Sequence, residues 1–189
     1  MTTYTVILDA CVLYPAPLRS YLLYLAQTGL YRAKWTNQIH DEWIRNVLKN
    51  RSDLSITPLL RVRQLMDQHA PDCLIEDYEL LINGIDLPDQ DDRHVVAAAI
   101  KGQAEGIITF NLKDFPEQEM ARLGLSAIHP DVFLTDMFHL DKASVLKAAQ
   151  HQRNAMRNPP MTSDEYLDCL QKQKLPNFVS HVREFSTIL

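Results

Sequence analysis

Residues 86–116 read DLPDQDDRHVVAAAIKGQAEGIITFNLKDFP, and this stretch decides the fold class of the chain. Acidic residues crowd its start, and an apolar run with helical spacing follows as far as Gly102, a residue type that commonly ends helices. A short apolar segment, 106–110, comes next and gives way to Asn111 and Asp114. The stretch therefore predicts a helix that opens among acids, followed by a strand that ends in an amide and a carboxylate.

The N-terminus repeats the pattern of an apolar strand that ends in a polar residue. Val6, Ile7 and Leu8 form an apolar run that leads into Asp9. A strand that is apolar on both faces is typical of the centre of a parallel sheet. In such sheets, ligand groups gather beyond the carboxyl ends of the strands. We therefore expect Asp9 and Asn111 to meet at one edge of the sheet.

Extended and helical patterns alternate along residues 1–138, whereas residues 139–189 show helical patterns only. The alternation predicts βαβ units, and so an α/β fold of the three-layer α/β/α kind with a central, mostly parallel sheet. The remainder predicts an all-helical C-terminal extension. Smaller features predict a loop over 10–17, a helix capped by Thr57, and a short strand over 73–75.

Composition narrows the class of protein. The net charge of −5 argues against a general polyanion binder, although acids gathered at a metal would account for much of that charge. Cys11, Cys73 and Cys169 are scattered and match neither a zinc spacing nor a disulfide framework. No run approaches the roughly 18 apolar residues of a membrane span. The N-terminus shows no signal peptide pattern, so we expect a cytoplasmic protein with no membrane partner.

Several oxygen-bearing side chains could converge as one cation site: Asp9, Glu42, Asp91, Asp92, Asn111 and Asp114. Carboxylate and amide oxygens without His or Cys suit Mg²⁺ or Mn²⁺. Because Mg²⁺ usually keeps waters and substrate phosphates among its ligands, such a pocket indicates phosphodiester chemistry. One or two ions would activate a water and neutralise charge on the leaving oxygen.

The same residues carry a resemblance to a known family. The chain resembles the PIN domain, the metal-dependent ribonuclease fold of VapC-type toxins from type II toxin–antitoxin pairs. The matching pieces are residues 6–9, 41–42, 88–95 and 108–116, and the resemblance covers roughly residues 3–138. It implies a PIN-like nuclease domain over 1–138. The helical residues 139–189 look like the extension of longer VapC-like members.

The resemblance also implies roles for individual residues. It gives Asp9, Glu42, Asp92 and Asp114 as catalytic residues, Asp9, Asp92, Asp91 and Asn111 as metal ligands, and Thr109 as a substrate-binding residue. Thr109 is also expected to support the fourth acidic position, which either Asn111 or Asp114 fills. At the third position this chain offers Asp89, Asp91 and Asp92, of which Asp92 is favoured and Asp91 comes second. Independently of the resemblance, a basic cluster predicts contacts to phosphates, with Arg45 and Lys49 as substrate-binding residues; its members are Arg45, Lys49, Arg51, Arg61 and Arg63.

Cofactor and partners follow from the same resemblance. It implies Mg²⁺ or Mn²⁺, an RNA substrate that water attacks in line, and a cognate antitoxin that covers or penetrates the acidic site. Basic residues would orient the RNA backbone, while loops and the helical extension would recognise the substrate. Whether the chain forms a homodimer is left open.

Other interpretations stay open at this point. The acids could simply cap helices and turns, His94 could be a packing or surface residue, and the basic cluster could be a solvated face. A catalytically degenerate PIN-fold module would bind nucleic acid or protein without metal. Asp9 as a phosphotransferase nucleophile lacks a second Asp at position 11. Cys11 as a phosphatase nucleophile lacks the arginine six residues on, where Pro17 stands.

Overall fold

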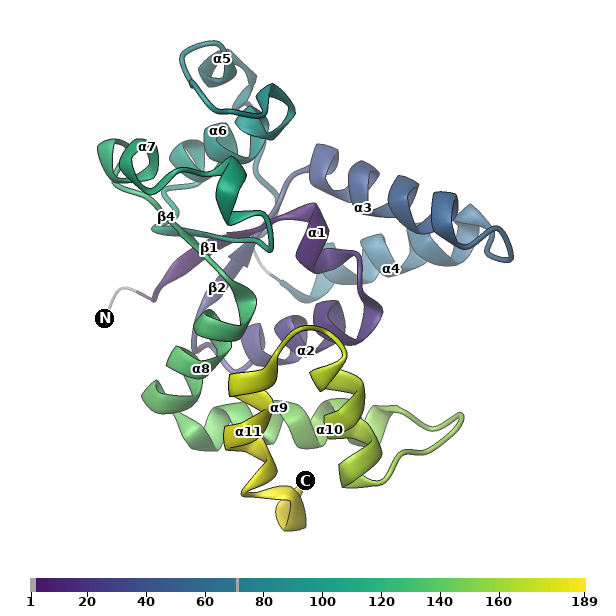
Figure 1. Ribbon diagram of the computed structural model, residues 1–189. Coiled ribbons are helices and arrows are strands. Elements are labelled where there is room, and N and C mark those ends of the chain that lie inside the picture. The colour runs from purple at the N-terminus through teal and green to yellow at the C-terminus, as the bar shows by residue number, and fades with distance from the viewer. Residues whose placement is uncertain (1–2, 71) are drawn as a thin grey trace.

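A parallel sheet of four strands forms the centre of the protein, in the order β2-β1-β3-β4. The computed structural model describes residues 3–70 and 72–189 (Figure 1). The strands are β1 (Thr5–Leu8), β2 (Arg32–Lys34), β3 (Gly106–Ile108) and β4 (Ser126–Ile128). Val6 pairs with Ala33 on one side and with Gly106 on the other, so β1 lies in the interior of the sheet. The prediction of a mostly parallel sheet is confirmed.

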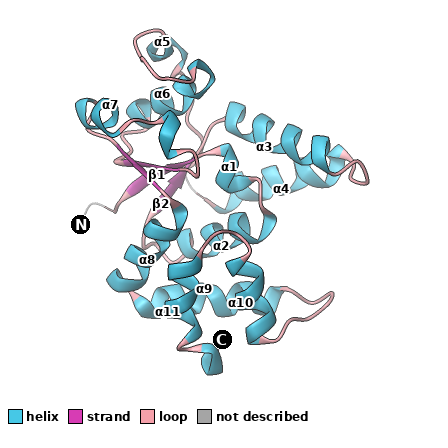
Figure 2. Ribbon diagram, viewed as in Figure 1, coloured by secondary structure: helices cyan, strands magenta, loops and turns pink. Residues whose placement is uncertain are grey.

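Helices surround the sheet (Figure 2). They are α1 (Ala10–Leu13), α2 (Ala16–Ala26), α3 (Asn37–Asn50), α4 (Ile56–His69), α5 (Glu79–Ile82), α6 (Arg93–Lys101), α7 (Glu117–Arg122), α8 (Pro130–Leu140), α9 (Lys142–Ala155), α10 (Ser163–Gln171) and α11 (Pro176–Arg183). In Figure 1, α6 and α7 lie on one side of the sheet and α2 lies on the other, next to α8–α11. None of the helices in the described residues is both long and apolar enough to cross a membrane.

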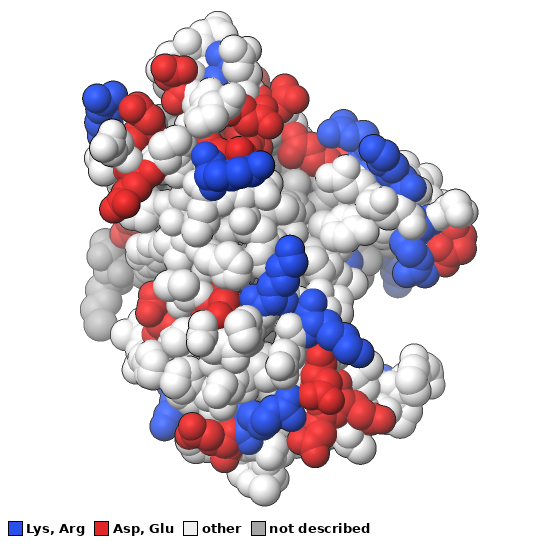
Figure 3. Space-filling model, viewed as in Figure 1, with Lys and Arg blue, Asp and Glu red and all other residues white. Residues whose placement is uncertain are grey.

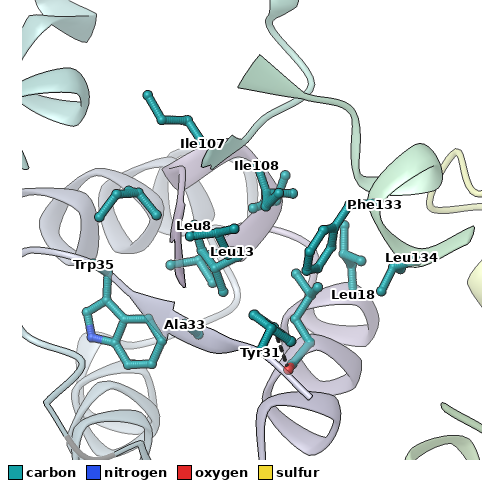
Figure 4. Packing of buried hydrophobic residues seen from close by; sticks show 14 of the residues in the cluster. Leu8, Leu13, Leu18, Tyr31, Ala33, Trp35, Ile107, Ile108, Phe133 and Leu134 are labelled. Carbon is teal, nitrogen blue, oxygen red and sulfur yellow. Dashed lines mark hydrogen bonds between the residues drawn. The ribbon is translucent and has the colours of Figure 1, made fainter. Parts of the chain in front are cut away.

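The core explains why β1 is apolar on both faces. Val6, Ile7 and Leu8 are all fully buried, as expected for a strand covered on both sides by helices. Beneath the sheet, the ring of Tyr31 meets that of Phe133 edge-on, with centroids 5.0 Å apart (Figure 4). Aromatic pairs of this geometry add roughly 0.5–1.5 kcal/mol beyond the apolar area they bury.

Helix α6 packs closely against the sheet. Its residues 94–99 are all buried, and the alanines among them let the helix approach the strands. Gly102 follows the helix with a φ of −80°, so the left-handed conformation is not what requires glycine here. A Cβ at Gly102 would lie 2.7 Å from Cδ1 of Ile75 and 3.0 Å from the Ala98 carbonyl oxygen. Any other residue here would push the Ile75 side chain aside and crowd the Ala98 carbonyl, and glycine avoids both contacts.

The helical extension shares its core with the α/β part. The Tyr21 hydroxyl of α2 donates to the Val145 carbonyl of α9 at 3.1 Å. The Gln152 side chain donates to the Pro17 carbonyl at 2.8 Å and accepts from the Tyr166 hydroxyl at 2.8 Å. Because these bonds are buried or half-buried and join α2, α9 and α10, the extension is packed onto the body of the protein.

Three local predictions were wrong. Residues 10–17 are not a plain loop, because the Asp9 carboxylate caps the short helix α1 within them. Helix α4 begins at Ile56 after Ser55, so Thr57 lies inside its first turn, where a following proline is tolerated. Residues 73–75 form only an isolated bridge, between Trp35 and Leu74, because a single residue of that segment pairs with the sheet.

Candidate active site

Asp9 leaves the end of β1 and is held by three hydrogen bonds. Its Oδ1 accepts from the Ala10 N–H at 2.7 Å, and its Oδ2 accepts from the Thr109 hydroxyl at 2.7 Å and from the Cys11 thiol at 3.1 Å. The Thr109 hydroxyl in turn accepts from the Asn111 N–H at 3.0 Å. This network joins the carboxyl ends of β1 and β3 and fixes a carboxylate that is only 4% exposed.

The acidic side chains raise one another's pKa values. Burial, reinforced by the charges of Asp9, Asp89 and Asp114, raises the pKa of Asp92 to about 7. Burial, reinforced by the charge of Glu42, also raises the pKa of Asp9, although its three hydrogen bonds favour the ionised form. Acids from four separate segments of the chain therefore lie close enough together to repel one another.

Glu42 is held by a partner that the sequence did not reveal. The Nε2 atom of His94, on α6, lies 2.9 Å from Oε1 of Glu42, on α3. His94 is buried, and its Nδ1 has no hydrogen-bond partner in the described residues. The neutral ring with its proton on Nε2 is the form that donates to Glu42 without leaving a buried N–H unbonded. Its position two residues after Asp92, beside the acids, was the available signal in the sequence.

A buried polar chain fixes α3 relative to β2 and α4. The Trp43 indole donates to Nδ1 of His40 at 2.9 Å, and Nε2 of His40 lies 3.0 Å from the Asp67 carboxylate. The same carboxylate oxygen accepts from the Trp35 indole at 2.8 Å. Since α3 carries Glu42, this chain sets the position of that carboxylate in the site.

The remaining predicted ligands differ in exposure. Asp92 precedes α6 and is half-buried, and Asp114 ends the short helix 112–114 and is also half-buried. Asn111 is exposed at the end of the β3 segment, and Asp91 is exposed with its N–H bonded to Asp89. The charges that act most strongly on Asp92 are those of Asp9, Asp89 and Asp114, so Asp91 is not among its closest acidic neighbours.

The predicted substrate-binding residues separate into two groups. Arg45 and Lys49 are exposed on α3, and neither forms an ion pair in the described residues. Thr109, in contrast, is fully buried behind Asp9, so its side chain is not presented to solvent and supports the site from behind. Its hydroxyl donates to Asp9 and not to a side chain at the fourth position, where support was expected; from Asn111 it accepts only the backbone N–H.

The basic cluster is smaller than the sequence suggested. Arg51 pairs with Asp53 at 2.7 Å, and Arg63 pairs with Asp41 at 2.8 Å. Two of its five members are therefore neutralised locally, and they offer less positive charge to a polyanion than their number in the sequence implies.

Cys11 is a hydrogen-bond donor to the site. Burial, reinforced by the charge of Asp9, raises the pKa of its thiol to about 12. A thiol with a raised pKa stays protonated at neutral pH and is a poor nucleophile. This disfavours the interpretation of Cys11 as a phosphatase nucleophile and explains why it donates to Asp9.

The residues of the site suit a hard divalent cation. Neither Asp9 nor Asp92 forms an ion pair with a Lys or Arg in the described residues, although both are at least half-buried. Within residues 3–70 and 72–189, no three His, Cys, Asp or Glu side chains form a ready-made ligand set. Mg²⁺ commonly takes one or two protein carboxylates and fills its other positions with water, so the oxygen donors here fit that ion.

Comparison with known proteins identifies the family. The PIN domain model matches residues 5–113, more than half of the chain, so the chain belongs to the PIN domain family. A second model, the VapC50 C-terminal domain, matches residues 130–184. The two matches confirm the resemblance to a VapC-type toxin with a C-terminal extension.

A curated relative supports the same assignment. The Mycobacterium tuberculosis protein named "Putative ribonuclease VapC50" is 38% identical over 92 residues, which cover 49% of this chain and 54% of that protein. The alignment thus spans about half the length of this relative. No solved structure matches the chain.

Proposed function

We propose that this protein is a divalent-metal-dependent endoribonuclease of the cytoplasm and the toxin of a toxin–antitoxin pair. The observation that carries the proposal is the buried Asp9 carboxylate, which lies among the charges of Glu42 and Asp92 with no Lys or Arg partner in the described residues. Membership of the PIN domain family, and the name of the similar M. tuberculosis protein, support the same activity.

Asp9 and Asp92 would hold Mg²⁺ or Mn²⁺, with Asn111 and Asp91 as further candidate ligands and Asp114 as an alternative to Asn111. Bound there, the ion would act as a Lewis acid toward water and the scissile phosphate. The Ala10 N–H, Thr109 and Cys11 keep Asp9 fixed. A fixed carboxylate needs little rearrangement on binding a cation, and such pre-organisation favours binding.

Glu42 would accept the proton of the attacking water, and His94 would orient its carboxylate for that transfer. Asp114 would be a further catalytic acid, since its charge reaches Asp92. Arg45 and Lys49, exposed on the helix that carries Glu42, would contact backbone phosphates of the RNA. A cognate antitoxin would cover the acidic site.

We assign the nuclease role to residues 1–138 and propose residues 139–189 as the extension. Helix α8 belongs to both, since it lies within 1–138 and also within the match to the VapC50 C-terminal domain.

Cleavage and metal binding together test the function. We expect the purified wild-type protein to cut single-stranded RNA in Mn²⁺ and to melt at a higher temperature in Mn²⁺ than in EDTA, because a ligand of the folded state stabilises it by mass action. Asp9→Asn and Asp92→Asn should fold but lose both effects. Asp136→Asn, at an exposed acid of α8, is the matched control and should behave as wild type.

The same experiment distinguishes the nuclease from the second candidate function. A catalytically degenerate binding module is favoured if Mn²⁺ leaves the melting temperature of the wild type unchanged and no RNA is cut. The neutral side chain of Asn111 is the feature that favours this alternative, because an amide is a weaker cation ligand than a carboxylate.

A further inference from the structure

A cleft of about 440 Å³ lies beside the acidic site. Helix α3, the segments that follow β1 and β3, and the turn between α10 and α11 form its walls. Its lining residues include Asn46, Asn50, Phe110, Asn111, Lys172 and Lys174. The cleft is therefore bounded on one side by the nuclease part and on the other by the helical extension.

The extension contributes two cations to this cleft. Lys172 and Lys174 are both exposed, and neither forms an ion pair in the described residues. The Lys174 ammonium lies 5.5 Å from the centre of the Phe110 ring, within reach of a cation–π interaction. Figure 3 shows basic side chains midway down this face, below the acidic side chains gathered over its upper part.

The turn that carries the lysines is held in place by the residues that follow it. Lys174 has a φ of 62°, and the next residue, Leu175, is fully buried. Within the first turn of α11, the Phe178 N–H and the Asn177 side chain both donate to the buried Asp131 carboxylate of α8, each at 2.8 Å. Because α11 is tied to α8 at its first turn, the two lysines lie at a defined position rather than on a free loop.

The cleft runs into the acidic site. Cys11, which donates to Asp9, also lines the cleft. On α3, Glu42, Asn46 and Asn50 are spaced four residues apart and so lie along one face of the helix. That face leads from the carboxylate next to Asp9 to the amides that line the cleft.

We infer that this cleft holds the stretch of single-stranded RNA next to the cleaved phosphodiester, with Lys172 and Lys174 on its backbone phosphates. The inference rests on the proposed nuclease function and names the substrate-binding surface of that site. Asn46 and Asn50 offer donors and acceptors to sugars or base edges. Grooves that combine fixed cations with an aromatic ring are typical single-strand sites, and the volume suits one nucleotide unit better than a duplex.

Single-stranded RNA is favoured over an antitoxin segment by the placement of the cations. In a chain of net charge −5, Lys172 and Lys174 line a cleft that leads to the acids, and Lys49 is exposed on α3, the helix that forms the opposite wall. A polyanion that must reach an acidic site needs such local positive charge to offset repulsion.

The test is RNA binding in EDTA, where cleavage is prevented. A short fluorescein-labelled single-stranded RNA is titrated with wild-type protein, with the double variant Lys172→Gln/Lys174→Gln, and with the control Lys101→Gln/Lys147→Gln, which makes the same charge change at exposed lysines outside the cleft. Each titration is repeated over a series of salt concentrations, and thermal melts verify that all three proteins fold.

We expect the cleft variant to bind about tenfold more weakly at low salt, with a salt slope less negative by about 1.4, since each lost phosphate contact on a single strand changes it by about 0.7. The control should match the wild type. Equal affinity and slope in cleft variant and wild type would overturn the inference and leave the cleft to a protein partner. Wild-type protein that binds RNA as expected but cuts none in Mn²⁺ would overturn the nuclease function alone.

Discussion

The Nε2 atom of His94 lies 2.9 Å from Oε1 of Glu42, across the boundary between α6 and α3. The contact joins a residue two positions after Asp92 with an acid that lies 52 positions before His94 in the chain. Because the His94 ring is buried and Glu42 is only partly exposed, the contact fixes the direction of the carboxylate rather than merely balancing charge.

Removing this contact should slow cleavage. We expect His94→Ala to lower kcat by about 10–100-fold, the usual cost of losing a residue that orients a site's ligands or base. His94→Gln, which places an amide donor near the position of Nε2, should recover part of the rate. Rates are measured on one RNA substrate at saturating Mn²⁺. Equal kcat values in His94→Ala and wild type would show that the contact only packs the helices.

Replacing Asp92 should change stability in a pH-dependent way when metal is absent. Its pKa is about 7 in the folded protein, against an ordinary value of 3.8. Between these values the folded state binds more protons than the unfolded state, so this group's contribution to stability is lost as pH rises through about 7. Asp92→Asn should therefore melt higher than wild type at alkaline pH in EDTA, and the gain should shrink as pH falls toward 5.

Saturating Mn²⁺ should reverse the order of the two proteins at alkaline pH, because only the wild type gains stability from the bound ion. Melting temperatures followed by calorimetry test both statements. If Asp92→Asn shows the same pH dependence as wild type in EDTA, the carboxyl does not titrate in this range.

Thr109→Val should destabilise the protein by about 1.5–3 kcal/mol, the usual range for a hydrogen bond to a charged group. Valine keeps the shape but removes the donor at 2.7 Å from Asp9. Denaturant unfolding measures the effect, and Thr109→Ser, which keeps the hydroxyl, is the control. We also expect weaker Mn²⁺ binding by the valine variant, since the loss of this donor raises the pKa of Asp9 further.

We expect Asp131 to stabilise the start of α11 and to keep the preceding turn in place. Asp131→Ala leaves the Phe178 N–H at the start of α11 without its acceptor and should cost about 2 kcal/mol in unfolding free energy. Asp131→Asn keeps one acceptor oxygen and should cost less. The alanine variant should also bind single-stranded RNA more weakly, because the lysines of the α10–α11 turn lose their fixed position. Unchanged RNA affinity in a folded alanine variant would contradict this.

Local patterns in the sequence were enough for the parts of the fold built from neighbouring residues. Apolar runs ending in Asp9 and Asn111 indicated the strands β1 and β3, and the run after Asp92 indicated α6, because burial on a sheet imposes its own periodicity. That β1 and β3 are neighbours in the sheet came only from the structure. The expectation for 73–75 failed because a strand depends on partners elsewhere in the chain, and only Leu74 found one.

The sequence was enough to propose the acids of the candidate site, but not the residues that contact those acids. Asp9 and Asp92 stand at element ends that a pattern can locate. His94, in contrast, matters only because folding brings Glu42 next to it, and the thiol of Cys11 donates to Asp9 in a geometry that the sequence does not show. The same holds for Lys172 and Lys174, whose distance in sequence from every acid of the site gave no sign that they share a cleft with Asn111.

Because α9 and α10 pack on α2, the C-terminal helices cannot be removed without exposing part of the core. Truncation after residue 138 would remove the Val145 carbonyl that Tyr21 donates to and the Gln152 side chain that donates to the Pro17 carbonyl. It would also expose an apolar face of α2 to water. Such a shortened chain should aggregate on expression, because the apolar face of α2 would lose the helices that cover it.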